Sequence, residues 1–210
     1  MLLIMMSLIG TASVFAFAVP ILVAYNAAVL RRSCGASAGE RVGYVAASFL
    51  FCAALATILA VTGVPDIYSL RMEPNVNLVP FLDIFTSTDQ YIANVLLFVP
   101  VGFLLPVLWE RFRTLRTVAL AGFLLSLAIE VAQMFSFRCT DVDDLLMNTA
   151  GALLGYGAFA LLRRLAPSIA LGGDALRRWK WEPMLYFASV WLGALLARPY
   201  VFDWLCGAVR

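Results

Sequence analysis

The sequence predicts an all-α protein, a polytopic membrane bundle of about six transmembrane helices with a partly re-entrant or interfacial outer loop. Of its 210 residues, 63% are hydrophobic and 13% are charged, whereas a soluble domain carries about 25% charged residues. The charges also fall in clusters between long apolar segments, as in proteins that cross a bilayer several times. No internal repeat or second domain is apparent, so residues 1–210 are expected to form a single membrane domain.

The predicted helices are the apolar segments that can cross the hydrocarbon core, which takes about 20 residues. They cover residues 1–30, 42–64, 91–109, 117–135, 141–162 and 183–205. The first segment has no basic residue before Arg31 and exceeds the apolar region of a signal peptide, so we interpret it as a membrane helix. Pro20 is expected to kink it, and Asn26 either satisfies a freed backbone group or lies near the interface.

The region between the second and third helices, residues 65–90, is less hydrophobic than its neighbours. It keeps an apolar run at residues 75–81, and Pro74 and Pro80 argue against another span there. We therefore expect this loop to fold back onto the membrane surface. The third helix contains two prolines and is expected to be kinked or interrupted.

Basic residues predict the orientation. Eleven of the fifteen Lys and Arg residues follow the first, third or fifth helix, namely Arg31, Arg32, Arg41, Arg111, Arg113, Arg116, Arg163, Arg164, Arg177, Arg178 and Lys180. With six spans these links share one side of the membrane, and the positive-inside rule makes that side the cytoplasm. We therefore expect a multi-pass membrane protein with both termini outside.

Residues 130–155 hold many polar side chains for so apolar a chain. Glu130 lies within the fourth helix, where a carboxylate costs on the order of 2–3 kcal/mol to insert and needs a partner or a raised pKa. Arg138, eight residues further on, is the partner that the sequence offers. The two form either a structural ion pair or part of a site, and we favour the site because intramembrane ionisable residues are functional by default.

Three aspartates, Asp141, Asp143 and Asp144, open the fifth helix. Asp141 is expected to be the N-cap, and Asp144 is favoured by the positive end of the helix. Capping needs only one or two carboxylates, so the remaining charge invites an Arg, a cationic ligand or a divalent cation. With oxygen ligands alone such a cation would be Ca²⁺, Mg²⁺ or Mn²⁺. There is no EF-hand spacing, and no other cofactor is expected.

Polar and small residues form one stripe on each of the fourth and fifth helices. The stripes are Gly122, Ser126, Glu130 and Gln133, and Asp144, Asn148, Gly151 and Gly155. Small residues let helices approach closely, so the stripes are expected to face each other just below the outer surface, with Asn94 of the third helix beside them. The candidate ligand-binding residues are Asn94, Glu130, Gln133, Arg138, Asp141, Asp143, Asp144 and Asn148, and the catalytic candidates are Glu130 and Asp144.

Several kinds of site are excluded. The chain has no histidine, which removes Ser-His and Cys-His nucleophiles and histidine zinc sites. No basic stripe interleaved with aromatic residues indicates nucleic-acid binding. The four cysteines show no CxxC spacing, but Cys139 and Cys206 are both expected on the outer side and could form a disulfide bond there.

Three blocks of the sequence resemble the VanZ-like family of small bacterial membrane proteins, over a core of about residues 66–165. They are residues 77–81, residues 94–106, and Glu130 and Gln133 followed by Arg138, Asp141, Asp143, Asp144, Asn148 and Gly151. The best-known member of this family is associated with teicoplanin resistance. The resemblance therefore implies a membrane location and a link to lipoglycopeptide resistance, but it implies no known reaction.

Three functions stay open. The first is an outward-facing polar pocket for a cell-envelope component or a glycopeptide, in which Arg138 holds a phosphate or carboxylate and neighbouring polar residues donate or accept hydrogen bonds. The second is an intramembrane hydrolase or transferase for a lipid-linked envelope substrate, with Glu130 as general base. The third is a proton-coupled transporter with Glu130 as relay, which is disfavoured because the first, second and sixth helices carry no ionisable residue midway. The sequence alone does not decide whether the protein is an enzyme.

Overall fold

The computed structural model describes residues 2–33, 35–72, 75–77, 79–81, 88–136, 139–166, 176 and 179–208. The side chains of residues 2–4, 139, 198, 199 and 201–208 lie outside this description. The chain divides into two compact units. Unit 1 consists of Met1–Ser69 and Ala170–Arg210, and unit 2 of Leu70–Ile169.

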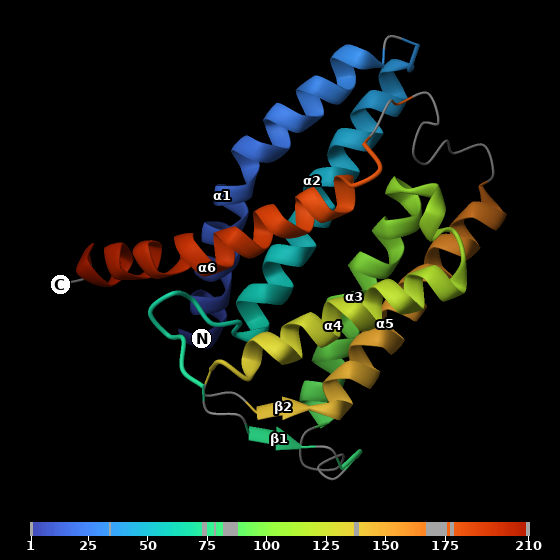
Figure 1. Cartoon of the computed structure of the whole chain (residues 1–210). Helices are drawn as coiled ribbons and strands as arrows, with labels where there is room; N and C mark the ends of the chain where they lie inside the picture. Colours follow the sequence, from blue (N-terminus) through green and yellow to red (C-terminus); the bar gives the residue numbers. More distant parts are fainter. Residues whose placement is uncertain are drawn as a thin grey trace. The chain divides into compact units, whose positions relative to one another are not determined.

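Unit 1 contains three helices, α1 (Leu2–Arg32), α2 (Ala38–Thr62) and α6 (Glu182–Ala208). α1 packs against both α2 and α6 (Figure 1). α2 begins four residues before the predicted start because Ser37 and Glu40 form a capping box there, which satisfies backbone N–H groups that a helix start leaves open. α2 ends at Gly63, whose φ of 69° is readily adopted only by glycine.

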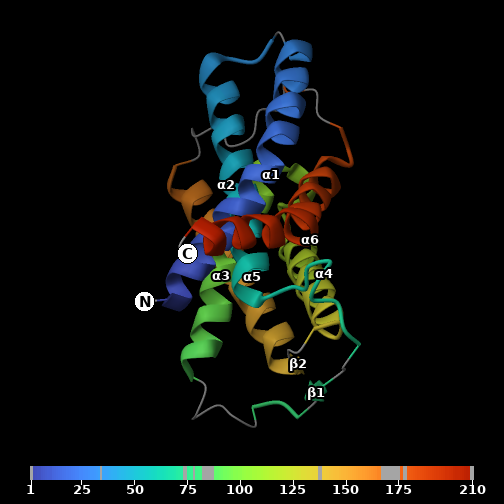
Figure 2. The ribbon, with the colours of Figure 1, turned by 90° about the vertical axis from the view of Figure 1, so that its left-hand side faces the viewer.

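Unit 2 contains α3 (Thr88–Leu108), the 3₁₀-helix η1 (Glu110–Phe112), α4 (Leu115–Gln133) and α5 (Val142–Leu165). α3 is one helix despite its two internal prolines, so it is not interrupted, and the alternative prediction of a kink stays a prediction. Two short strands, β1 (Asn75–Asn77) and β2 (Cys139–Asp141), pair in parallel at the start of α5 (Figure 1), and Figure 2 labels both near that end of α5. The sequence did not predict these strands, because three residues are too few to show the alternation typical of a strand.

Glycines set the contact between α3 and α5. A Cβ at Gly151 would overlap the backbone carbonyl of Val95, and one at Gly102 would overlap the backbone of Ala152. Gly155 meets the α3 backbone in the same way. The prediction that the glycines of α5 face α4 is therefore wrong, because small residues permit close approach to a helix without specifying which helix.

The small and polar stripe of α4 does face α5, but it meets Ala152 and Asn148 rather than the glycines of α5. A Cβ at Gly122 would lie 2.7 Å from the Cβ of Ala152, and Ser126 and Asn148 are hydrogen-bonded across the same interface. α5 therefore packs against α3 and α4 on different faces, and it carries the polar residues between them.

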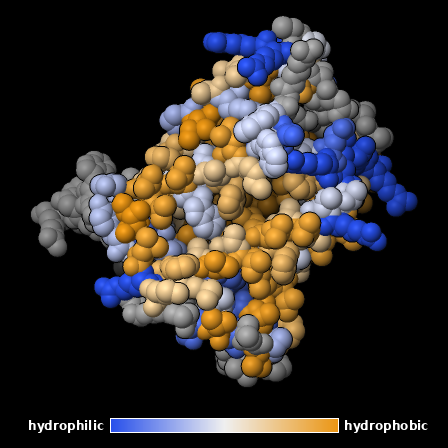
Figure 3. Space-filling view, viewed as in Figure 1, coloured by the Kyte–Doolittle hydropathy of each residue, from blue (hydrophilic) through white to orange (hydrophobic). Residues whose placement is uncertain are grey.

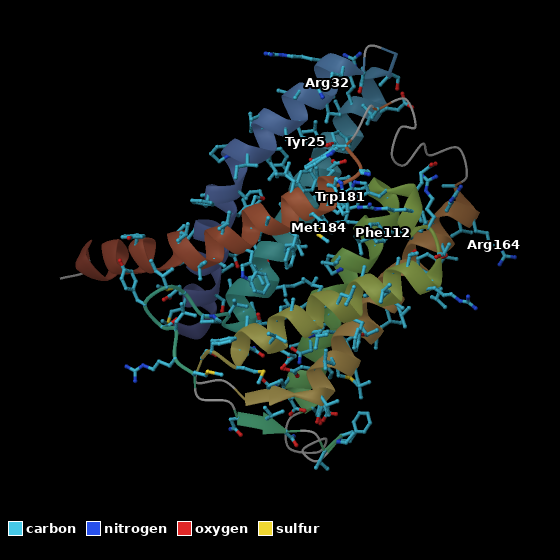
Figure 4. All side chains as sticks on the ribbon, in the orientation of Figure 1. Tyr25, Arg32, Phe112, Arg164, Trp181 and Met184 are labelled. Carbon is cyan, nitrogen blue, oxygen red and sulfur yellow. The ribbon has the colours of Figure 1, made fainter. Side chains whose placement is uncertain are left out.

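Unit 2 separates its charges along the helices. Basic residues lie where α3 ends, α4 begins and α5 ends, and the Tyr156 hydroxyl donates to the carbonyl oxygen of Arg113 at this end, at 3.1 Å. Arg164 points away from the last turn of α5 (Figure 4). The acidic residues Glu130, Asp141 and Asp143 lie at the opposite ends of α4 and α5. This polarity within unit 2 agrees with the charge pattern from which the orientation was predicted.

Within the described residues, α1 to α5 are long and apolar enough to cross a membrane, over Met5–Arg32 in the case of α1. In α6 the stretch Glu182–Ala197 is a shorter apolar helix. Apolar side chains cover much of the face seen in Figure 3, and those exposed on α4 are Leu115, Leu120, Phe123, Leu124, Leu127 and Val131. An all-α membrane bundle is thus confirmed, whereas the count of six spans, the outer termini, the surface position of the loop and the single domain stay predictions.

Candidate functional site

One group of polar side chains lies where α3 begins, α4 ends and α5 begins. We call it the polar cluster and define it by Asn94, Ser126, Glu130, Asp141, Asp143, Asp144 and Asn148. Gln133, one turn beyond Glu130 on α4, is also buried. Arg138 lies outside the described residues, and so do the side chains of Cys139 and Cys206. The predicted Glu130–Arg138 pair and the disulfide bond therefore stay predictions.

Glu130 is the buried carboxylate that joins α4 to β2. Its side chain is 2% exposed, and its Oε2 accepts the backbone N–H of Asp141 at 3.0 Å. The Thr140 hydroxyl donates to the Glu130 carbonyl oxygen at 3.1 Å, which also accepts the backbone N–H of Met134 at 3.2 Å. Glu130 forms no ion pair with a Lys or Arg of the described residues, so its charge has no compensation there.

Asp141 is the N-cap of α5, as predicted. Its Oδ1 accepts the backbone N–H of Asp143 at 2.9 Å, and its Oδ2 accepts the side-chain amide of Asn77 at 3.2 Å. A cap of this kind stabilises a helix by about 1 kcal/mol. Because Asn77 also pairs with Asp141 in the β1–β2 register, Asp141 has a structural role that accounts for both of its carboxylate oxygens.

Asp143 holds the loop that precedes α3. It is buried and accepts the Tyr91 hydroxyl at 2.6 Å and the backbone N–H of Phe81 at 2.9 Å. Phe81 has φ of 58°, in the left-handed region that non-glycine residues rarely adopt. Tyr91 was missed by the sequence analysis, because a tyrosine near a helix start is typical of a membrane interface and gives no separate signal.

Asp144 joins α5 to α3. Its Oδ1 accepts the side-chain amide of Asn94 at 2.5 Å, so Asn94 lies beside the aspartates as expected. The carbonyl oxygen of Asp144 accepts the Ser126 hydroxyl at 3.4 Å, a long hydrogen bond. Together these contacts bring α3, α4 and α5 to one point of the cluster.

Asn148 has incomplete hydrogen bonding among the described residues. It is 2% exposed, and its Nδ2 donates to the Ser126 hydroxyl at 2.9 Å. Its Oδ1 is fully buried and has no hydrogen-bond partner among the described residues. A buried acceptor without a donor costs about 1–3 kcal/mol, so the folded protein retains it at a cost in stability.

The three aspartates do not converge on one point, because each accepts hydrogen bonds from different donors. Within the residues that the structure describes, no group of three or more His, Cys, Asp or Glu side chains could hold a metal ion. A divalent cation at Asp141, Asp143 and Asp144 stays a prediction.

A second set of buried polar residues occurs in unit 1, and we call it the tyrosine cluster. It consists of Asn26 (α1), Tyr44 and Ser48 (α2), and Glu182 and Tyr186 (α6). The hydroxyls of Tyr44 and Tyr186 donate to Oε1 of Glu182 at 2.5 and 2.8 Å. Sequence analysis missed it because Glu182 was assigned to the link before the sixth helix, and its partner Tyr44 is 138 residues away.

Asn26 belongs to this cluster, so the prediction that it satisfies a freed backbone group is wrong, whereas its position near the interface stays a prediction. Its Nδ2 donates to the Ser48 hydroxyl at 3.0 Å, and its Oδ1 lies 3.3 Å from the Tyr186 hydroxyl, whose one hydrogen it shares with Glu182. The Tyr25 hydroxyl of α1 accepts the backbone N–H of Trp179 at 3.1 Å, and its ring packs edge-on against Tyr186. Figure 4 labels Tyr25 together with Trp181, which directly precedes α6.

Comparison with known proteins relates the polar cluster to a family. A family model described as VanZ/LLP1 matches residues 46–163, more than half of the 210 residues. Protein VanZ of Enterococcus faecium is 35% identical over 91 residues, which cover 41% of this chain and 53% of that protein. The match thus spans about half the length of this curated relative. No solved structure matches the chain significantly.

The matched segment contains every residue of the polar cluster. Of the tyrosine cluster it contains only Ser48, and Asn26, Tyr44, Glu182 and Tyr186 lie outside it. The two buried clusters therefore differ in their relation to the family.

Proposed function

The chain belongs to the VanZ/LLP1 family, and on that premise we propose that its polar cluster binds a cell-envelope component or a lipoglycopeptide. Binding takes place at the outer face of the bacterial cytoplasmic membrane and contributes to glycopeptide resistance of the teicoplanin type. Membrane lipids surround the apolar helices. The polar cluster is the part of the molecule that recognises the ligand.

The observation that carries this proposal is the incomplete hydrogen bonding of Glu130 and Asn148. Both side chains are 2% exposed. Buried polar groups in folded proteins nearly always have partners, and exceptions point to a role or to a bound molecule. Asn148 keeps an acceptor without a described donor, and Glu130 keeps a carboxylate with one described side-chain hydrogen bond. A ligand that supplies the missing partners would account for both.

Binding is favoured over catalysis because the cluster offers no nucleophile with a base beside it. The Ser126 hydroxyl donates to the Asp144 carbonyl oxygen, and the Thr140 hydroxyl donates to the Glu130 carbonyl oxygen. Neither hydroxyl hydrogen therefore points to a carboxylate that could remove it. The hydrolase or transferase alternative has no observation in its favour among the described residues.

The test is drug susceptibility in cells that express the full chain. Glu130→Gln keeps the shape of the side chain and removes its charge, and Arg138→Ala removes the cation that the sequence offers. We expect either change to abolish a resistance phenotype at unchanged membrane levels, measured by immunoblot of the membrane fraction. Glu110→Gln is the control, because Glu110 is exposed and lies outside the polar cluster. Full resistance in both Glu130→Gln and Arg138→Ala would contradict the proposal.

A further inference from the structure

The polar cluster shows which hydrogen-bonding groups are already used within the protein. Asp141 uses both carboxylate oxygens on the N–H of Asp143 and the amide of Asn77. Asp143 binds Tyr91 and Phe81. The Ser126 hydroxyl accepts from Asn148 and donates to a carbonyl oxygen. These residues hold the cluster together, and their polar atoms are occupied.

The remaining polar atoms include two hydrogen-bond acceptors, one on α4 and one on α5. Oε1 of Glu130 and Oδ1 of Asn148 accept no hydrogen bond from any described residue. Glu130 follows Ser126 by one helical turn, and Asn148 is bonded to Ser126. Residues one turn apart have Cβ atoms about 5–6 Å from each other. The two acceptors therefore belong to the same part of the α4–α5 interface.

These two acceptors determine which chemical group of a ligand could bind beside them. A phosphate or carboxylate group brings further acceptors and negative charge, so it cannot satisfy Glu130 and Asn148. A hydroxyl has a single hydrogen, so it can donate to only one of the two acceptors, and it brings no positive charge that would stabilise an ionised Glu130. A primary ammonium has three N–H donors and a positive charge, and it satisfies both requirements.

We propose, on the basis of the proposed function, that the ligand presents a primary ammonium group that donates to Glu130 Oε1 and Asn148 Oδ1. Such a group occurs in an ethanolamine phospholipid head group and in soluble amines such as amino sugars. The exposed apolar residues Leu127 and Val131 flank Glu130 on α4. A lipid whose chains lie against α4 could therefore bring its head group to this position.

Quaternary ammonium groups provide the sharpest comparison, because they keep the charge and lack the N–H donors. The experiment uses the full-length protein in detergent with dihexanoyl phosphatidylethanolamine, dihexanoyl phosphatidylcholine and dihexanoyl phosphatidylglycerol as probes. Affinities come from native mass spectrometry and are checked by thermal stabilisation. We expect the ethanolamine lipid to bind about tenfold more tightly than the choline lipid, since charge-assisted hydrogen bonds are the stronger kind.

Variants connect this preference to the two acceptors. Glu130→Gln and Asn148→Leu should each reduce the affinity for the ethanolamine lipid toward that for the choline lipid, and Glu110→Gln should change neither. If Glu130→Gln does not fold, Asn148→Leu carries the test. Equal binding of the ethanolamine and choline lipids, tighter binding of the glycerol lipid, or a preference that persists in the folded variants overturns the inference.

Soluble probes distinguish the source of the ammonium group. Binding of phosphoethanolamine or glucosamine as tightly as the ethanolamine lipid identifies a soluble ligand, and binding of the lipid alone identifies a head group. No binding of any amine overturns the inference. If resistance depends on Glu130 while amine preference is absent, the ammonium inference fails and the proposed function stands. If the protein prefers amines but resistance does not depend on Glu130, the proposed function fails.

Discussion

The two buried clusters of this protein contain similar residues, but they differ in how completely these residues are hydrogen-bonded. In the tyrosine cluster of unit 1, the Glu182 carboxylate accepts two tyrosine hydroxyls, and Asn26 uses both its oxygen and its nitrogen. In the polar cluster of unit 2, Glu130 and Asn148 keep acceptors without described donors. A complete network stabilises and positions helices, whereas an incomplete one costs stability unless something binds.

The two clusters also differ in their relation to the family. The incomplete cluster lies within the segment that the VanZ/LLP1 model matches, and most of the complete cluster lies outside it. We interpret the tyrosine cluster as the means by which this chain holds α6 against α1 and α2. The polar cluster serves recognition, so the two should respond in opposite ways when their residues are changed.

The largest expected effect is the loss of stability on Glu182→Ala. The change removes the acceptor of the Tyr44 and Tyr186 hydroxyls, and hydrogen bonds to charged groups contribute about 1.5–3 kcal/mol each. We expect a destabilisation of about 3–5 kcal/mol, measured by chemical or thermal unfolding of the purified protein in detergent.

Glu110→Ala is the matched control for that change. Glu110 is 57% exposed and pairs with Arg113 at 2.8 Å, and such surface pairs are worth about 0–1 kcal/mol. If Glu182→Ala unfolds no more readily than Glu110→Ala, the tyrosine cluster is not a stabilising network. If Glu182→Ala remains stable and loses ligand binding, the division between the clusters is wrong.

An intermediate effect on stability is expected for Tyr91→Phe. This variant tests the hydrogen bond between Tyr91 of α3 and Asp143 of the polar cluster. The change removes the donor at 2.6 Å from Asp143 and leaves the Phe81 N–H in place. We expect a loss of about 1.5–3 kcal/mol, measured by unfolding, with faster hydrogen exchange at the Phe81 amide. Tyr68→Phe removes an exposed hydroxyl and should change stability by less than about 0.5 kcal/mol. Equal stabilities of the two variants would show that Asp143 does not depend on Tyr91.

Helix spans and local helix signals could be predicted from the sequence because they depend on neighbouring residues. Long apolar runs indicated the helices, and an aspartate before an apolar stretch identified the cap at Asp141. Asn94 could be placed beside the aspartates because helical spacing puts it on the same face as Gly102, which packs against α5.

Contacts between distant segments could not be predicted in the same way. The helix that Gly151 and Gly155 face, the pairing of β1 with β2, and the meeting of Tyr44 with Glu182 all depend on how helices are arranged in space. A single sequence shows which residues are small or polar, and it does not show which of them meet. The incomplete hydrogen bonding of Asn148 belongs to this second kind of information.

The smallest change in stability, and the most informative one, is expected for Asn148→Leu. The variant loses the 2.9 Å hydrogen bond to Ser126, worth about 0.5–1.5 kcal/mol, and it also removes a buried acceptor that costs about 1–3 kcal/mol. The free energy of unfolding should therefore stay within about 1 kcal/mol of the original value, or rise. In the tyrosine cluster, Asn26→Leu removes an amide whose donor and acceptor are both used, so it should destabilise by about 1–3 kcal/mol. Unfolding of both variants in the same detergent measures the difference. If Asn148→Leu costs as much as Asn26→Leu, Asn148 is satisfied in the folded protein, and the polar cluster is a second structural network rather than a recognition site.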